Sequence, residues 1–338
     1  YVIENLPGWI PQYVCSTQVR WGGVGPAEEM ALGIANFLTY VEAGLARGLK
    51  LEQLVPTMDL HMSTEGDIFE EVAKYRATRR LYAKLIKERY NVEDPNIAGL
   101  RLSTYTAGHR MTAQQPLNNV VRSTLHVLAA MLGGVEHIWA PAYDEALALP
   151  TYESTRVAQL TKQIIHHESG ITNTVDPLAG SYFLEDLTSK LEEEARLILD
   201  QVEGMGGAIP AIEAGFYDRK MVEGTVRYQR QVDFGERVVI GVNQFREEEE
   251  QPVPIFQVHP ETEQRQVQRV VRLRWERDGA LAKKTLARLR DACQRKVEDH
   301  HYNTVPAMLD AVRASCTVGE IFDVMRAAFG EHVSSGTF

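Results

Sequence analysis

Polar side chains suited to chemistry follow two short apolar runs in the middle of the chain. A β-rich run at 100–106 ends near Gly108, and a loop rich in amide side chains comes next. A second apolar run, 135–140, leads into a loop that holds Asp144 and Glu145. In parallel α/β folds, the loops at the carboxyl ends of the strands carry the chemistry. The sequence therefore predicts a binding or catalytic site built from these loops.

The elements that must position these loops alternate along the first half of the chain. Four apolar runs are predicted as strands, at 13–19, 58–62, 100–106 and 135–140. Each precedes residues with the apolar spacing of a helix, at 27–47, 68–90, 120–132 and 151–167. This alternation predicts a parallel sheet with right-handed crossovers. A closed (β/α)8 barrel needs about 250 residues, so we predict an α/β fold of the TIM-barrel type with half of the barrel in residues 1–170.

The pattern changes after residue 170, and residues 171–338 are predicted to form a mainly helical C-terminal region. The run 235–242 is the exception and is predicted as a buried strand, followed by a solvated loop of four acids at 247–250. The predicted helices of this region lie at 183–202, within 264–296 and, as a pair, at 306–329.

Composition excludes several classes of protein. The chain has 338 residues, 24% of them charged, and a net charge of −10, which argues against nucleic acid as a partner. No apolar run approaches the roughly 20 residues needed to cross a bilayer, and no signal peptide opens the chain. Cys15, Cys293 and Cys316 lie far apart in the sequence, which favours neither disulfides nor a metal cage. We expect a reduced cytoplasmic protein that does not bind membranes.

Seven motifs spread over the chain carry a resemblance to a known family. They are FEEVAKYRATRRL, TAGxxxTAQQPxNNVVR, LAAxLGG, YDEALALPT, TVDPLAGSYFLEDLT, GGAIPAIEAGF and GERVVIGVNQF. Together they closely resemble the large, substrate-binding subunit of adenosylcobalamin-dependent acyl-CoA mutases. That family includes methylmalonyl-CoA mutase and its isobutyryl-CoA and 2-hydroxyisobutyryl-CoA relatives. The resemblance covers nearly the whole chain.

The resemblance implies a fold, a reaction and partners. In the family a (β/α)8 barrel binds the acyl-CoA along its axis, and adenosylcobalamin lies against the carboxyl ends of the strands. The cofactor supplies radicals that rearrange the carbon skeleton, while the protein positions the substrate and excludes water. The matching residues begin where the family's barrel is half built and end before its cobalamin-binding domain. We therefore expect a second chain that supplies the first half of the barrel, and a small cobalamin-binding subunit that holds most of the cofactor.

Two residues are assigned to catalysis by this resemblance. The family has Ser-Gly-Tyr-His-Met-Arg-Glu at the end of the first of these strands, where the His bonds the thioester carbonyl of the substrate. The matching run here is 15–21, so Gln18 replaces that His. An amide can donate a hydrogen bond to a carbonyl but cannot act as an acid. Tyr105 replaces a family Gln near the substrate and is assigned with Gln18.

Four further residues are assigned to the substrate. The resemblance places the family's Pro-Arg-Leu-Ser, whose Arg and Ser contact the CoA tail, at the end of the second strand. Thr57 and Asp59 stand in those two places here, and an anion in place of a cation works against binding a polyphosphate. Ser103 replaces a family His, and Glu136 replaces a family Gln.

Four residues are assigned to the cofactor, and none to a metal. Gly108 and Glu145 match the family's residues beside the corrin ring, His109 occupies a variable position there, and Ala146 follows Glu145. The alternative for Glu145 is a helix-capping role. The run 59–64 comes within one residue of the cobalt-ligating Asp-x-His-x-x-Gly motif but aligns with a barrel strand, so its histidine is not assigned as a ligand.

Scaffold residues thus match the family, whereas substrate-facing residues depart from it. One interpretation is a mutase component that acts on an unusual acyl substrate. The other is a non-catalytic subunit whose barrel is kept for assembly. We favour the catalytic interpretation because Gly108 and Glu145 are retained.

Overall fold

The computed structural model describes residues 3, 6, 8–247, 253–299 and 302–331. It divides into two compact units, with the boundary between Phe256 and Gln257.

The first unit is built on a four-stranded parallel sheet. Its strand order, β1-β2-β3-β4, is the order of the strands in the sequence. Helical segments join each strand to the next. The strands are β1 (Gln12–Cys15), β2 (Met58–Thr64), β3 (Leu102–Thr106) and β4 (His137–Trp139). The predicted parallel sheet of half-barrel type is therefore confirmed.

The first strand is shorter than predicted, and its extension to residue 19 is wrong. The amide of Ser16 still bonds the carbonyl of His61 on β2, at 2.8 Å. Beyond it the chain turns into the short helix α2 (Thr17–Trp21). Gln18 therefore lies on a helix that follows the strand.

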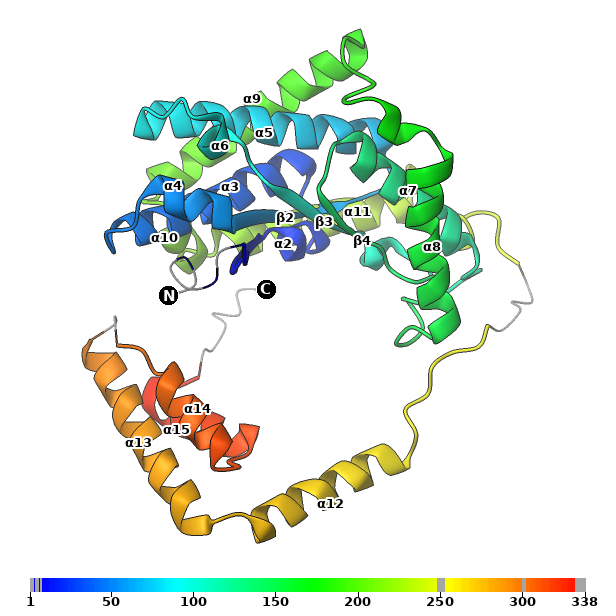
Figure 1. Ribbon diagram of the computed structural model, residues 1–338. Coiled ribbons are helices and arrows are strands. Elements are labelled where there is room, and N and C mark those ends of the chain that lie inside the picture. Colours follow the sequence, from blue (N-terminus) through cyan, green and yellow to red (C-terminus); the bar gives the residue numbers. More distant parts are fainter. Residues whose placement is uncertain (1–2, 4–5, 7, 248–252, 300–301, 332–338) are drawn as a thin grey trace. The chain divides into compact units, whose positions relative to one another are not determined.

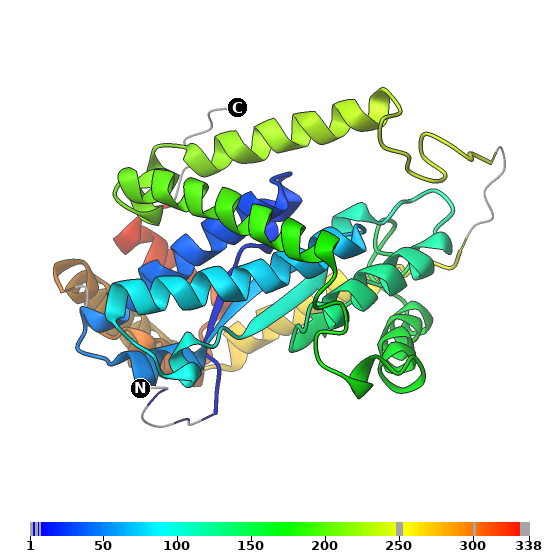
Figure 2. The same cartoon turned by 90° about the horizontal axis from the view of Figure 1, so that it is seen from above.

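Three long helices cover one face of this sheet. Helix α9 packs against both α3 and α5, and Figures 1 and 2 show the three on the same side of the strands. Helix α5 begins at its N-cap Asp67, whose carboxylate accepts from the amide of Glu70, and ends at Asn91 with φ 53°. The long helices of this unit are α3 (Pro26–Leu45), α5 (Ile68–Tyr90), α7 (Asn118–Leu132), α8 (Tyr152–Glu168), α9 (Tyr182–Gly204) and α11 (Phe216–Asp233). The short helical segments are α4 (Leu51–Leu54), η1 (Val55–Thr57), α6 (Pro95–Ala98), η2 (Gly108–Arg110), η3 (Ile171–Asn173) and α10 (Ala208–Glu213).

The hydrophobic core lies between these helices and the sheet. The rings of Phe37 on α3 and Tyr82 on α5 meet edge to face, with centroids 5.3 Å apart, and both are fully buried. Met62 of β2 points to the same side, where the hydroxyl of Thr78 on α5 approaches its sulfur. Even-numbered residues of β2 therefore face the helices. Because side chains alternate along a strand, the odd-numbered residues face the opposite side.

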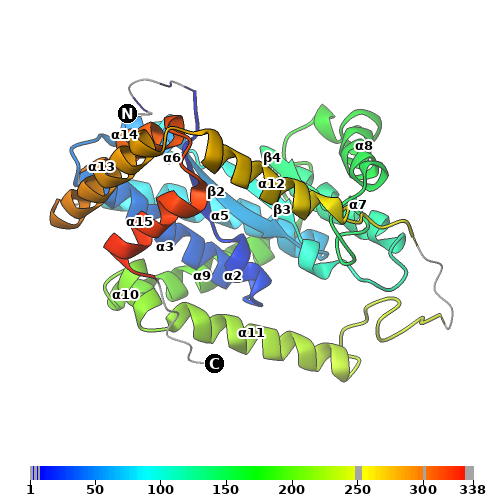
Figure 3. The same ribbon diagram turned by 90° about the horizontal axis from the view of Figure 1, so that it is seen from below.

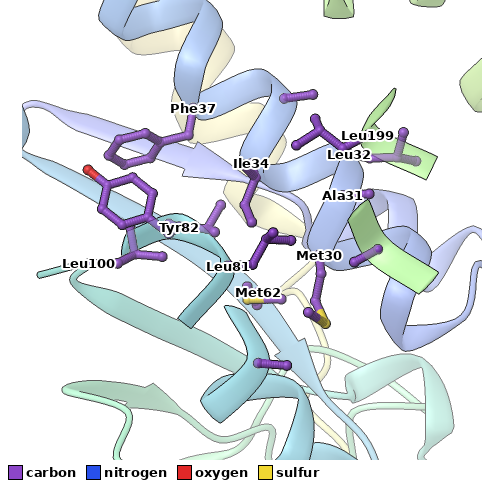
Figure 4. Packing of buried hydrophobic residues seen from close by; sticks show 14 of the residues in the cluster. Met30, Ala31, Leu32, Ile34, Phe37, Met62, Leu81, Tyr82, Leu100 and Leu199 are labelled. Atoms are coloured by element: carbon purple, nitrogen blue, oxygen red, sulfur yellow. The ribbon is translucent and has the colours of Figure 1, made fainter. Parts of the chain in front are cut away.

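The glycine-rich loop after α2 is explained by close helix packing. Helix α11 passes beside α2 (Figure 3). A Cβ atom on Gly224 of α11 would lie 2.0 Å from the carbonyl oxygen of Gly23, and one on Gly22 would lie 2.5 Å from the sulfur of Met221. These glycines allow two backbones to touch.

The predicted buried strand at 235–242 is wrong. This segment forms turns with a single bridge between Ile240 and Gln244, and most of its side chains are exposed. The side chain of Asn243 makes backbone hydrogen bonds that a neighbouring strand would otherwise make. It accepts from the amide of Val239 and donates to the carbonyls of Val232 and Arg237. The predicted acidic loop at 247–250 falls, after residue 247, outside the described residues.

The second unit is helical, as predicted. The charged region within 264–296 is two helices, α12 (Glu261–Glu276) and α13 (Gly279–Glu298), separated at Asp278, whose carboxylate caps α13. The predicted pair at 306–329 is α14 (Val305–Arg313) and α15 (Val318–Phe329). Helices α13, α14 and α15 share a small core that includes the thiols of Cys293 and Cys316. Among all described helices of the chain, none has the length and apolar character needed to span a bilayer.

Candidate active site

The odd-numbered residues of the strands form a polar and aromatic face, which we call the inner face. Its members pair across the sheet at the same levels, His61 with Ser103 and Ser103 with His137, then Ser63 with Tyr105 and Tyr105 with Trp139. The face consists of Tyr13, Cys15, Asp59, His61, Ser63, Ser103, Tyr105, His137 and Trp139.

A hydrogen-bonded chain runs across the inner face. The hydroxyl of Ser103 donates to Oδ1 of Asp59 and lies 2.8 Å from Nδ1 of His61. The ring of His61 in turn meets Trp139 and Tyr13 edge to face, at 5.4 and 6.2 Å between centroids. Asp59 and Ser103, both predicted to contact substrate, are thus brought together.

Tyr105, Gly108 and Glu145 meet at the carboxyl end of β3. The hydroxyl of Tyr105 hydrogen-bonds the carboxylate of Glu145, which arrives on the loop after β4. A Cβ atom on Gly108 would lie 3.1 Å from Oε1 of Glu145 and 3.5 Å from the ring of Tyr105. A larger residue would therefore crowd this pair. Burial raises the pKa of Glu145, and the bond from Tyr105 lowers it in part.

Trp21 links the group formed by Tyr105, Gly108 and Glu145 to the ionic contacts around Glu65. Its ring meets Tyr105 edge to face and lies tilted against His109, both with centroids 5.5 Å apart. Its Nε1 donates to the hydroxyl of Ser63 at 3.0 Å. Nε2 of His109 lies 3.2 Å from Oε1 of Glu65, the residue that directly follows β2. The carboxyl ends of β2 and β3 are therefore linked through aromatic and ionic contacts.

Glu65 is the acidic residue that Arg20, His109 and Arg110 all contact. It pairs with Arg20 at 3.3 Å and with Arg110 at 3.1 Å, and it is 6% exposed. Burial alone would raise the pKa of Glu65, but Arg20, His109 and Arg110 more than offset this and lower it well below its usual range. The pKa of His109 is lowered by burial, despite its bond to Glu65. A neutral His109 donates from Nε2 to Glu65 and keeps Nδ1 as an acceptor.

The amide-rich loop before α7 is structural. Asn119 is fully buried, and its amide nitrogen donates to the carbonyls of Thr112 and Tyr143 while its oxygen accepts from the amide of Thr112. Gln115 donates to the carbonyl of Phe245, and Arg122 donates to that of Ile240. The motif therefore ties the loops after β3 and β4 to the 240–245 segment.

Two predicted residues lie apart from these contacts. Gln18 is exposed on α2. Ala146 is exposed in the turn after Glu145 and offers only a methyl group.

Thr57 and Glu136 lie at the opposite, amino end of the strands. The run 56–59 spans the end of η1 and the first two residues of β2, so its expected place at the end of that strand is wrong. The hydroxyl of Thr57 donates to the carbonyl of Leu54. Glu136 directly precedes β4, and its carboxylate accepts from the amide of Leu102 at 2.9 Å. These two side chains therefore bond the protein backbone.

The sequence interpretation missed four residues of these groups, Trp21, His61, Glu65 and Trp139. Strict alternation along β2 places His61 on the same face as Asp59, so that signal was available. Trp21 ends the short helix α2 and Glu65 lies in the loop after β2. Tertiary packing fixes both positions, and local spacing carries no signal for them.

Comparison with known proteins supports a single family. The family model described as methylmalonyl-CoA mutase matches residues 1–331. The large subunit of 2-hydroxyisobutanoyl-CoA mutase from Aquincola tertiaricarbonis is 36% identical over 100% of this chain and 60% of its own length. The methylmalonyl-CoA mutases of Rhizobium meliloti and Escherichia coli are 35% and 34% identical over 99% and 97% of this chain, covering 46% and 45% of their own lengths.

The chain thus spans about half the length of these curated relatives. The match extends through both the half-barrel and the helical C-terminal region. The chain belongs to the methylmalonyl-CoA mutase family.

Proposed function

We propose that this chain is the substrate-binding component of an adenosylcobalamin-dependent mutase that rearranges the carbon skeleton of a short acyl-CoA or related acyl thioester. In this proposal residues 1–170 supply half of the barrel and residues 171–338 supply the C-terminal region of the large subunit. The observation that carries it is the convergence of Tyr105, Gly108 and Glu145 at the carboxyl end of the inner face.

The residues at this end of the sheet suit a large flat cofactor. Gly108 leaves room that a Cβ atom would fill beside Glu145, and the partly buried Glu145 carboxylate can accept hydrogen bonds from amide groups of a corrin ring. His109 and Ala146 border the same place in sequence. When bound, adenosylcobalamin supplies the radical that begins the rearrangement. Among the described residues no group of three or more His, Cys, Asp or Glu side chains could hold a metal ion. Following the family resemblance, we assign cobalt ligation to a partner.

This chain's own residues bind and orient the substrate in the proposal. The inner face holds the acyl group and its arm, Tyr105 packs against the acyl group, and Gln18 donates to the thioester carbonyl. Trp21 and Trp139 exclude water from this face. Asp59 and Ser103 lie on the part of the inner face that receives the arm of the substrate, while Thr57 and Glu136 lie at the far end of the arm.

Two partners complete the proposed assembly. Strands β1 and β4 are the edges of the sheet in the described residues, and exposed edges favour pairing with further strands. We assign these further strands to a chain that carries the first half of the barrel. A small cobalamin-binding subunit holds the rest of the cofactor.

The test is reconstitution with these partners under anaerobic conditions. We expect isomerised product, and an electron paramagnetic resonance signal that depends on substrate, with one of methylmalonyl-, isobutyryl- or 2-hydroxyisobutyryl-CoA. Replacing Gly108 by Val should abolish both the product and the paramagnetic resonance signal, because the larger side chain crowds Glu145. The control is Gly204→Ala, where an added Cβ meets no atom within 4 Å. An assembled complex that binds adenosylcobalamin but gives neither product nor radical would refute catalysis.

That negative result would favour the non-catalytic alternative. One observation supports this alternative, since Gln18, which replaces the family's histidine, is exposed on α2. In that case the half-barrel serves assembly alone.

A further inference from the structure

The mutase function proposed above gives no role to His61, although its ring lies in the middle of the inner face. Its neighbours are polar on one side and aromatic on the other. Ser103 lies 2.8 Å from Nδ1, and the edges of Tyr13 and Trp139 flank the ring. The side chain is partly exposed, so a ligand can reach the ring.

The direction of the hydrogen bonds fixes which ring nitrogen carries the proton. The hydroxyl of Ser103 has one hydrogen, and it donates that hydrogen to Oδ1 of Asp59. With Asp59 ionised, the same oxygen can only accept toward His61, so Nδ1 of His61 is the N–H donor. A neutral imidazole with a proton on Nδ1 has a lone pair on Nε2. Burial lowers the pKa of His61 to about 4, which keeps the ring neutral at pH 7.

Asp59 is the anchor of this chain. It is fully buried at the second residue of β2, and its second oxygen, Oδ2, has no hydrogen-bond partner within the described residues. Burial raises the pKa of Asp59, and the bond from Ser103 lowers it in part. The charged groups around this carboxyl are Glu136, His137 and Arg101. A buried carboxyl with an unused oxygen disfavours an anionic ligand at this level and favours a neutral one that donates hydrogen bonds.

We propose that Asp59, Ser103 and His61 form a hydrogen-bonded relay that presents Nε2 of His61 as a fixed acceptor, and that this acceptor binds an amide N–H of a pantetheine arm. The proposal rests on the mutase function, because the thioesters handled by such enzymes carry this arm. The relay deepens that function by naming the chemical group recognised in the middle of the inner face. His61 is a binding residue in this scheme, and Ser103 and Asp59 are positioning residues that act through it.

The first test reads the tautomer of His61 in the full chain without cofactor or turnover. Long-range ¹H–¹⁵N correlation of ¹⁵N-histidine-labelled protein at neutral pH should show His61 with a protonated Nδ1 and a bare Nε2, the signal being assigned by its loss in His61→Asn. In Ser103→Ala the preference of His61 for a protonated Nδ1 should be lost. Ser123→Ala, which alters a buried serine on α7, should leave it unchanged. A wild-type His61 protonated on Nε2 would overturn the relay.

The second test measures binding with three probes, namely pantetheine, phosphopantetheine and CoA. Pantetheine at millimolar concentration should shift the Nε2 resonance of His61, and Ser103→Ala should weaken its binding about fivefold to tenfold, as expected for one hydrogen bond. A shift with CoA alone, or with none of the probes, would overturn the assignment to the arm. Should the relay fail while the reconstituted complex still turns over acyl-CoA, the mutase function would stand without it. Should the relay hold in a complex without turnover, the binding site would stand alone.

Discussion

Nζ of Lys74 lies 2.8 Å from Oε2 of Glu29, and neither side chain is exposed to solvent. The same ammonium pairs with Glu71 at 2.6 Å and donates to the carbonyl of Ser63 on β2. Burial alone would lower the pKa of Lys74, but the two carboxylates more than offset this and raise it. The group therefore joins α3, α5 and the end of β2 directly beneath the candidate site.

Replacing Lys74 by Met should destabilise the first unit strongly. The change leaves the carboxylates of Glu29 and Glu71 buried without their main cation, which typically costs about 3–5 kcal/mol. Equilibrium urea unfolding measures this loss. The control is Lys190→Met, which removes an exposed pair with Asp186 and should cost less than about 1 kcal/mol. Equal effects of the two substitutions would contradict a buried ionic cluster.

Replacing Tyr105 by Phe should raise the pKa of Glu145. Burial already raises this pKa, and the bond from the Tyr105 hydroxyl holds it down in part. Removing the hydroxyl leaves burial and the nearby Asp144 carboxylate, which both raise the pKa of Glu145, so the carboxyl should protonate at higher pH than in the wild type. A ¹³C-glutamate NMR titration follows this change. Tyr152→Phe, at an exposed tyrosine, should leave the Glu145 titration as it is. An unchanged titration in Tyr105→Phe would show that the two groups do not bond in solution.

Replacing Gly224 by Ala should separate α11 from the loop after α2. The added Cβ would lie 2.0 Å from the carbonyl oxygen of Gly23, a backbone atom that cannot rotate away. Overpacking of this kind costs about 1–3 kcal/mol, more than the roughly 1 kcal/mol that alanine gains over glycine inside a helix. Urea unfolding should therefore show a net loss. Gly204→Ala, in open space at the end of α9, should be neutral or stabilising; a Gly224→Ala variant as stable as wild type would mean that the close contact does not form.

The order of strands and long helices could be predicted from the sequence because periodicity is a local property. Met62 and His61 occupy alternate positions on β2, so the two faces of that strand follow from spacing alone. The helix at Thr17 was missed because its five residues are too few to distinguish a strand from a short helix. Val239 and Ile240 look like a strand, yet Asn243 satisfies that backbone locally.

The candidate site was predictable only in part, for the same physical reason. Gly108 and Glu145 came from motifs that match a family, and the fold brings them together. The pairing of Glu65 with His109 and Arg110 depends on how the segments that follow β2 and β3 are placed in space. A spacing argument cannot supply such a contact, because it joins residues separated by 45 positions through tertiary structure.

In the second unit, Arg277 donates two hydrogen bonds to the carboxylate of Glu320. Nη1 and Nη2 of Arg277 lie 2.7 and 2.6 Å from the two carboxylate oxygens, and the amide of Thr317 donates to the same carboxylate at 2.8 Å. The bond from Arg277 is the main reason that the pKa of Glu320 is lowered from 4.5 to about 2. This contact connects the residue before the N-cap of α13 to the first turn of α15.

Acid should therefore weaken the second unit over a defined range of pH. A group whose pKa is depressed by folding contributes stability that is complete above its unfolded pKa and is lost as the pH falls toward its folded pKa. For Glu320 this loss should occur between about pH 4.5 and pH 2. Glu320→Gln should remove that part of the pH dependence and cost about 1–2 kcal/mol at neutral pH, as measured by hydrogen exchange at the buried Leu289. Asp323→Asn, which alters an exposed pair with Arg326 on the same helix, should lose stability with falling pH as the wild type does. If Glu320→Gln and wild type lose stability in parallel over this range, another group must carry the acid sensitivity.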